Sequence, residues 1–193
     1  MVTSFIKFAL LATLGESIGL RIRNGVYNKK EFGLIPRAVV WGFIGLTIKT
    51  AFVIFSTGTP EFLAFLGFEK AVEVMAGPFS PSKLLVSFSI SVAMNAFYAP
   101  IMMTVHKIAD THIIDNNGTI RGFFTPIQFG KIMAHMDWSV HWHFVLKKTI
   151  PLFWVPAHTV TFLLPSHYQV LFAAVLGIVL GVLLAIASLM SRK

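Results

Sequence analysis

The stretch 169-QVLFAAVLGIVLGVLLAIASLM-190 has no charged residue along its whole length. An α-helix rises about 1.5 Å per residue, so about 20 apolar residues cross the roughly 30 Å of hydrocarbon in a bilayer. The chain as a whole has the same character, with 55% apolar and 12% charged residues among its 193. This composition is wrong for a soluble domain of that size. The sequence therefore predicts an integral membrane protein, and this stretch is its clearest transmembrane helix.

Four further apolar stretches extend the pattern, at about residues 5–20, 38–55, 84–105 and 150–165. They are too long for strands, and the strict period of two that a membrane barrel requires is absent. We therefore predict an all-α fold, an integral membrane bundle of four to five transmembrane helices that forms a single multi-pass membrane domain. Residues 106–148 are predicted to be its one sizeable connection outside the membrane, on the inner side.

Basic residues gather in the loop 21-RIRNGVYNKKEFGLIPR-37, which holds five Lys/Arg, and the chain ends in Arg192-Lys193. The positive-inside rule places both on the cytoplasmic or matrix-like side. An inner C-terminus requires residues 150–165 to cross as a fifth span, and if they only dip into the bilayer, four spans remain. Basic residues beside spans attract anionic lipid headgroups, so the formal charge of +8 indicates a lipid partner and no nucleic acid.

Histidines are concentrated in 135-HMDWSVHWH-143, but their spacing fits neither a helical i, i+4 pair nor a known zinc pattern. Because tryptophans alternate with them, we expect an interfacial helix at the headgroup level and no metal site. The stretch 115-DNNG-118 lacks the acids of a calcium loop and is predicted to be a turn.

Sequence signatures of catalysis are missing: there is no phosphate loop, nucleophile elbow or HExxH motif. His106 and Asp110 form an i, i+4 pair just past the third predicted span, where we expect a lipid-facing or helix-capping role. The chain has no cysteine, which excludes disulfides and cysteine metal ligands. The sequence therefore predicts neither an enzyme nor a cofactor.

Polar groups inside the predicted spans are the candidate functional residues, because ionisable groups are rare in a bilayer. They are Glu16, Lys49, Asn95, His158 and Thr161. Helix rise places Lys49 and Asn95 roughly 18 Å, and His158 roughly 15 Å, from the inner basic anchors. Glu16 lies nearer the inner interface, so a direct Glu16 to Lys49 ion pair would be strained.

Two interpretations of these polar groups remain open. Lys49, Asn95 and His158 could face a water-filled path, in which a hydrated Lys49 would favour anions. They could instead form isolated interhelical hydrogen bonds that hold the bundle together. Pro156 removes an amide donor from the stretch 150-IPLFWVPAHTVTFLLP-165 and frees carbonyls that lipid cannot satisfy. We therefore expect the polar groups that follow it to face protein or water.

Glycines at one-turn spacing, Gly15-xxx-Gly19 and Gly177-xxx-Gly181, would let helix backbones approach closely. Close approach of this kind supports a compact bundle or a homo-oligomer.

Three motifs follow one another in the first half of the chain, 15-GESIGLRI-22, 35-IPRAVVWGFIG-45 and 94-MNAFYAP-100, and a fourth lies within 150–165. Together they resemble the Mpv/PMP family, the peroxisomal membrane protein of twenty-two kilodaltons and its mitochondrial inner-membrane relatives. The matching positions are Gly15, Arg37, Gly42, Gly45, Pro100, Trp154, Pro156, Phe162 and Pro165.

This resemblance implies a channel or facilitator for small metabolites, anionic ones among them. It implies a mitochondrial inner or peroxisomal membrane, and a bacterial cell membrane is equally compatible with the sequence. The alternative is a non-transporting membrane-organising or scaffold protein.

Overall fold

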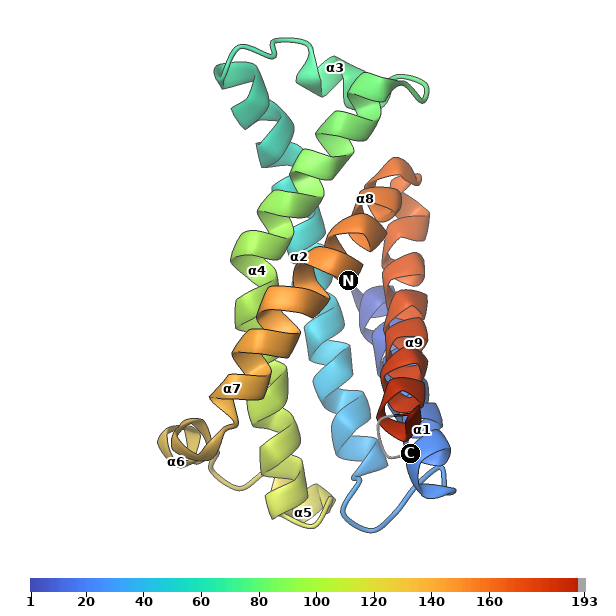
Figure 1. Ribbon diagram of the computed structural model, residues 1–193, viewed down its shortest axis with the longest axis vertical. Coiled ribbons are helices and arrows are strands. Elements are labelled where there is room, and N and C mark those ends of the chain that lie inside the picture. The colour runs from blue at the N-terminus through green and yellow to red at the C-terminus, as the bar shows by residue number, and fades with distance from the viewer. Residues whose placement is uncertain (191–193) are drawn as a thin grey trace. The chain divides into compact units, whose positions relative to one another are not determined.

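The computed structural model describes residues 1–190, and within them the chain is all-α and contains no strand, as the sequence predicted (Figure 1). The helices are α1 (Val2–Asn24), α2 (Leu34–Phe65), α3 (Ala71–Ala76), α4 (Pro81–Asp115), α5 (Ile120–Phe123), α6 (Phe129–His135), α7 (Trp138–Val140), a π-helix (His141–Trp154), α8 (Val155–Leu163) and α9 (Ser166–Met190).

Three of these helices are long and apolar enough to cross a membrane: α2, α4 and the part of α9 from Ser166 to Ile186. They contain most or all of the predicted spans 38–55, 84–105 and 169–190, and they fit an integral membrane protein. The predicted spans 5–20 and 150–165 lie in α1 and in the segment formed by the π-helix and α8. The count of four to five spans stays a prediction.

The described chain divides into two compact units. Unit 1 comprises Met1–Thr47, Thr104–Met136 and the chain from Val170 onward, and unit 2 comprises Ile48–Met103 and Asp137–Gln169. Both α2 and α4 therefore contribute one part of their length to each unit. Most of the predicted site residues fall into two groups, one within each unit.

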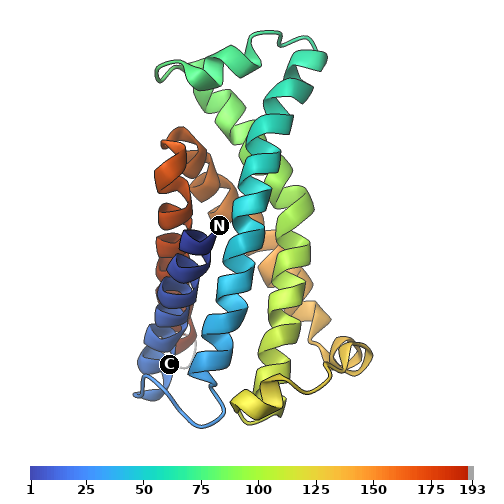
Figure 2. The same cartoon turned by 180° about the vertical axis from the view of Figure 1, so that it is seen from behind.

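Glycines set the helix packing of unit 1. A Cβ on Gly15 would lie 2.9 Å from the Cα of Ile178, so α1 and α9 can approach only because Gly15 has no side chain. A Cβ on Gly42 would lie 2.4 Å from the ring of Phe5, and one on Gly45 would lie 2.6 Å from Phe8. The side chains of α1 thus fill the space that these two glycines leave on α2. Figures 1 and 2, which are opposite views, both show α1 beside α9.

Turns at one end of unit 1 are built on backbone that favours glycine. Gly25 ends α1 in the left-handed conformation (φ 78°), and its amide donates to the carbonyl of Arg21. The predicted turn at residues 115–118 is confirmed, with positive φ at Asn117 (55°) and Gly118 (65°). A Cβ on Gly118 would lie 2.6 Å from the amide nitrogen of Gly33, so the two loops meet backbone to backbone.

The π-helix of unit 2 has a proline, Pro151, inside it. In an α-helix, the ring of Pro151 would clash with the carbonyl of Lys147 four residues earlier, and the wider π register relieves this clash. Val155 closes the helix by donating its amide to Ile150, five residues back. The π-helix continues directly into α8, so Pro156 at the second position of α8 leaves a carbonyl of the preceding turn without its amide donor.

One predicted helix is divided in the structure. The interfacial helix expected over 135-HMDWSVHWH-143 is wrong as a single element, because α6 ends at His135 and a new helix begins after Asp137. The carboxylate of Asp137 accepts a hydrogen bond from the amide of Val140 at 2.9 Å. This cap starts a separate helical turn.

Candidate functional site

A cluster of charged side chains lies within unit 1, at the N-terminal end of α2. Arg37, in the first turn of α2, donates from one terminal nitrogen to Oε2 of Glu16 on α1 at 2.5 Å. The same nitrogen donates to Oδ1 of Asp110 on α4 at 2.7 Å. One guanidinium therefore joins three helices and is shared by two carboxylates.

Arg37 is held in place by its own helix start. Its Nε donates to the carbonyl of Phe32 at 2.6 Å, and the guanidinium carbon lies 4.6 Å from the centre of the Phe32 ring. The Arg37 side chain is 8% exposed, and those of Glu16 and Asp110 are each 21% exposed. At this burial the ion pairs are little screened by solvent, so their geometry matters more than that of surface pairs.

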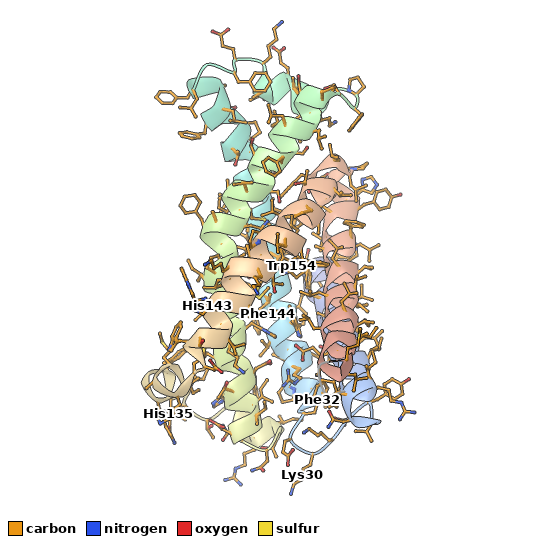
Figure 3. The ribbon with its side chains drawn as sticks, viewed as in Figure 1. Lys30, Phe32, His135, His143, Phe144 and Trp154 are labelled. Atoms are coloured by element: carbon orange, nitrogen blue, oxygen red, sulfur yellow. The ribbon has the colours of Figure 1, made fainter. Side chains whose placement is uncertain are left out.

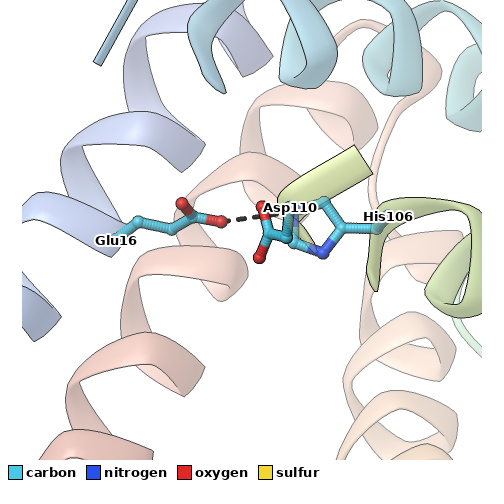
Figure 4. A group of neighbouring side chains, drawn as sticks. All are labelled: Glu16, His106 and Asp110. Atoms are coloured by element: carbon cyan, nitrogen blue, oxygen red, sulfur yellow. Dashed lines mark ion pairs between the residues drawn. The ribbon is translucent and has the colours of Figure 1, made fainter. Parts of the chain in front are cut away.

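His106 and Trp41 complete the cluster. The indole nitrogen of Trp41 donates to Oε1 of Glu16 at 2.9 Å, and its ring lies 4.4 Å from that of His106. The Nε2 atom of His106 lies 3.2 Å from Oε1 of Glu16 and 3.7 Å from Oδ1 of Asp110 (Figure 4). This buried nitrogen therefore lies near two acceptors but makes no hydrogen bond among the described residues.

The same atoms resemble a metal site. Glu16, His106 and Asp110 each offer one ligand atom, and these atoms lie within 4.8 Å of one another. The Arg37 guanidinium, however, already contacts both carboxylates. A divalent ion in the cluster would therefore have to bind beside a permanent positive charge or displace it. The cluster carries its own cation, and we assign no metal to it.

A cavity of about 550 Å³ borders this cluster within unit 1. Its walls include Glu16, Arg37 and Asp110 from the cluster and Gly19 and Gly181 from the contact between α1 and α9. A volume of this size lies in the range of sites for small molecules. The remaining charged groups of the wall are Arg23, Lys29 and Glu31, and Lys29 pairs with Glu31 at 3.5 Å.

A second polar group lies within unit 2. Nδ2 of Asn95 on α4 lies 3.0 Å from Nδ1 of His158 on α8, and Asn95 is 1% exposed. Asn95 also donates to the carbonyl of Ser91 at 2.8 Å, and the Ser91 hydroxyl donates to the carbonyl of Val155 at 2.7 Å. Polar side chains of α4 thus contact both the backbone and a side chain of α8.

Aromatic rings enclose this second group. The ring of His158 stacks on that of Trp154 with centroids 5.1 Å apart. The ring of Phe52 packs edge-on against the His158 ring, with centroids 5.7 Å apart. Phe52 also contacts Phe162 at 5.2 Å. The indole nitrogen of Trp154 is buried without a hydrogen-bond partner among the described residues. The Asn95 and His158 pair is therefore surrounded by packed rings.

The structure unites some predicted site residues and separates others. Asn95 and His158 are in contact, and Thr161 is buried nearby on α8 with its hydroxyl donating to Ala157. Lys49 lies half-buried on α2, with no ion pair or hydrogen bond among the described residues. Glu16 belongs to the other unit, where its partner is Arg37.

The family-motif positions have structural roles that can be described one by one. Gly15, Gly42 and Gly45 permit helix contacts, Arg37 organises the charged cluster, and Trp154 and Phe162 pack around the second polar group. Pro100 lies inside α4, and Pro156 begins α8. Pro165 directly precedes α9, and its carbonyl accepts a hydrogen bond from the amide of Tyr168 in the first turn of that helix.

One prediction is wrong. His106 and Asp110 were expected to face lipid or cap a helix beyond a span, but α4 continues to Asp115 and both side chains are largely buried against Glu16 and Arg37. The hydrophobic stretch ended earlier than the helix did. An i, i+4 His and Asp pair at the same end of the bundle as a buried arginine was the signal that could have revealed them.

Comparison with known proteins adds no relative: no protein-family model, curated protein or solved structure matches this chain.

Proposed function

We propose that this chain is a member of the Mpv/PMP family that acts as a channel or facilitator for small solutes in its membrane, without enzymatic activity. The observation that carries the proposal is the cavity of about 550 Å³ with charged walls in unit 1. Buried ionisable groups in a membrane bundle are costly and commonly mark solute or ion pathways. The motif residues Gly15 and Arg37 lie in the wall of this same cavity.

The charge of the wall indicates which solutes it favours. Arg37 contacts both Glu16 and Asp110, so this group has one carboxylate more than it has guanidinium cations, and Lys29 is paired with Glu31. Arg23 lines the cavity and has no ion pair among the described residues. Three carboxylates and three cations balance in the wall, so a small polar solute fits this lining, and Arg23 is the group that attracts the anionic part of such a solute.

A plug at Gly19 tests the path. A Cβ on Gly19 would lie 3.5 Å from its nearest neighbours, so a side chain can be added there without a backbone clash and would extend into the cavity. We expect Gly19→Leu to reduce the flux of small anions from liposomes several-fold. Gly58→Leu is the matched control, because a Cβ on Gly58 meets nothing within 4 Å. Equal flux through both variants and the unmodified protein would refute the proposal.

A non-transporting membrane organiser is the second candidate, and one observation favours it. The polar groups of unit 2 satisfy one another among packed aromatic rings, as interhelical hydrogen bonds in a purely structural bundle do. The presence of solute flux separates the two functions, and Lys49→Met tests whether Lys49 takes part in that flux. Solute flux and anion preference that are unchanged by this substitution would place Lys49 outside any solute path, and a protein without flux at all would leave the organising role.

A further inference from the structure

An apolar cavity of about 450 Å³ lies between α1 and α2 within unit 1, apart from the charged cluster. Its walls run from Phe5 to Ser17 on α1 and from Leu34 to Val39 on α2. Along α1 this is roughly 18 Å, a length over which an acyl chain can lie. Leu10, Leu14 and Ile35 are wall residues that remain exposed, so the cavity is open at the protein surface.

One polar atom in the wall of this cavity has no partner. The hydroxyl of Thr13 is buried and makes no hydrogen bond among the described residues, and Thr13 is 5% exposed. Other helical threonines of the chain behave differently: Thr111, Thr159 and Thr161 each donate to the carbonyl four residues earlier. Because a buried hydroxyl without a partner is costly, Thr13 indicates a ligand that supplies an acceptor.

A polar cavity of about 390 Å³ adjoins the apolar one, and Leu34 and Ile35 line both. Its other walls include Lys29 and Lys30, and Figure 3 shows Lys30 in the loop between α1 and α2. The 32-residue helix α2 begins at Leu34, so its free amides and partial positive charge face this end. Lys29 pairs with Glu31, and Lys30 has no ion pair among the described residues.

We propose that an anionic phospholipid of the surrounding bilayer binds across these two cavities. One acyl chain lies in the apolar cavity, the Thr13 hydroxyl donates to an ester carbonyl of the lipid, and the phosphate lies between Lys30 and the start of α2. Arg21 adds to the positive field, since it stacks on Tyr27 close to Ser17, whose hydroxyl donates to the Tyr27 carbonyl. Lys29 lines both this polar cavity and the charged cavity of the proposed solute path, so the lipid site is tested by lipid binding and not by solute flux.

Binding can be measured on the purified full chain by native mass spectrometry and by the melting temperature in detergent. The probes are phosphatidylglycerol, phosphatidylcholine with the same acyl chains, and inorganic phosphate. We expect phosphatidylglycerol to bind most tightly and to raise the melting temperature. A lysine near an anionic surface contributes about fivefold in affinity, so Lys29→Gln with Lys30→Gln should lower the affinity for phosphatidylglycerol about 25-fold.

Matched variants separate the headgroup from the acyl chain. Arg121→Gln with Lys131→Gln removes the same charge at exposed positions outside both cavities and should leave the affinity unchanged. Ala9→Phe fills the apolar cavity and should abolish tight binding of phosphatidylglycerol, whereas Ala96→Phe, at an exposed position of α4, should not.

Thr13→Val tests the unpaired hydroxyl directly, and we expect it to weaken phosphatidylglycerol binding several-fold. Unchanged affinity with a higher melting temperature of the lipid-free protein would show an ordinary unpaired hydroxyl and overturn its role. Stabilisation by inorganic phosphate equal to that by phosphatidylglycerol, or full lipid binding by Ala9→Phe, would overturn the lipid site as a whole.

Discussion

Replacing Arg37 with methionine should destabilise the protein far more than any other loss of a single positive charge. Methionine keeps much of the volume and the apolar stem but removes the guanidinium that contacts Glu16 at 2.5 Å and Asp110 at 2.7 Å. The two carboxylates would then remain in a largely buried site without their cation. Removal of one partner from a buried ion pair costs about 3–5 kcal/mol.

The lower half of that range applies here. Glu16 keeps the hydrogen bond from Trp41 at 2.9 Å, and His106 stays 3.2 Å away, so one carboxylate retains other polar neighbours. Asp110 has fewer alternatives. We therefore expect the free energy of unfolding to fall by about 3–4 kcal/mol. When Arg37→Met is combined with Glu16→Gln and Asp110→Asn, no buried charge is left uncompensated, and the loss should shrink to about 1 kcal/mol.

Denaturant titration of the purified protein in detergent, followed by tryptophan fluorescence, measures these differences. The control is Lys29→Met, because the Lys29 and Glu31 side chains are 49% and 53% exposed and lie 3.5 Å apart. Such a surface pair contributes less than about 1 kcal/mol. The reasoning would be refuted if Arg37→Met and Lys29→Met had the same effect, or if the triple variant were no more stable than Arg37→Met alone.

Two further predictions concern packing and the second polar group. Gly42→Leu should destabilise the protein by about 1–3 kcal/mol because its Cβ would overlap the Phe5 ring. Gly58→Ala should stabilise it by about 0.5–1 kcal/mol because its Cβ meets nothing within 4 Å. The same denaturant titration measures both changes. Asn95→Leu should cost about 1–3 kcal/mol because it leaves His158 buried without its polar partner, and addition of His158→Leu should recover part of that loss in a double-mutant cycle. Additive costs of the two substitutions would contradict the pairing of Asn95 with His158.

The sequence predicted most of the apolar helices, because hydrophobic length alone identifies a span. It could not predict where those helices end, since polar residues extend a helix past the hydrocarbon without changing its register. The helix α4 continues through Asp110 to Asp115, where the predicted turn stops it. The charged cluster was missed for this reason, although Glu16 and Arg37 were both candidates.

The sequence indicates how deep a residue lies along a helix, but not which way its side chain points around the helix axis. Depth alone therefore does not predict which residues pair. Their depths predicted a strained pair between Glu16 and Lys49. The actual partner of Glu16 is Arg37, in the first turn of α2. The π register was equally hidden, because its period is longer than that of an α-helix and Pro151 alone does not predict it. The contact between Asn95 and His158, by contrast, agrees with their similar predicted depths.

Single-channel recording on the purified protein in a planar bilayer tests the proposed function most directly. The account predicts discrete openings that favour small anions, a smaller conductance for Gly19→Leu, and an unchanged conductance for Gly58→Leu. If the protein added no conductance to the bilayer, the result would contradict the account and leave the chain as a structural component of its membrane.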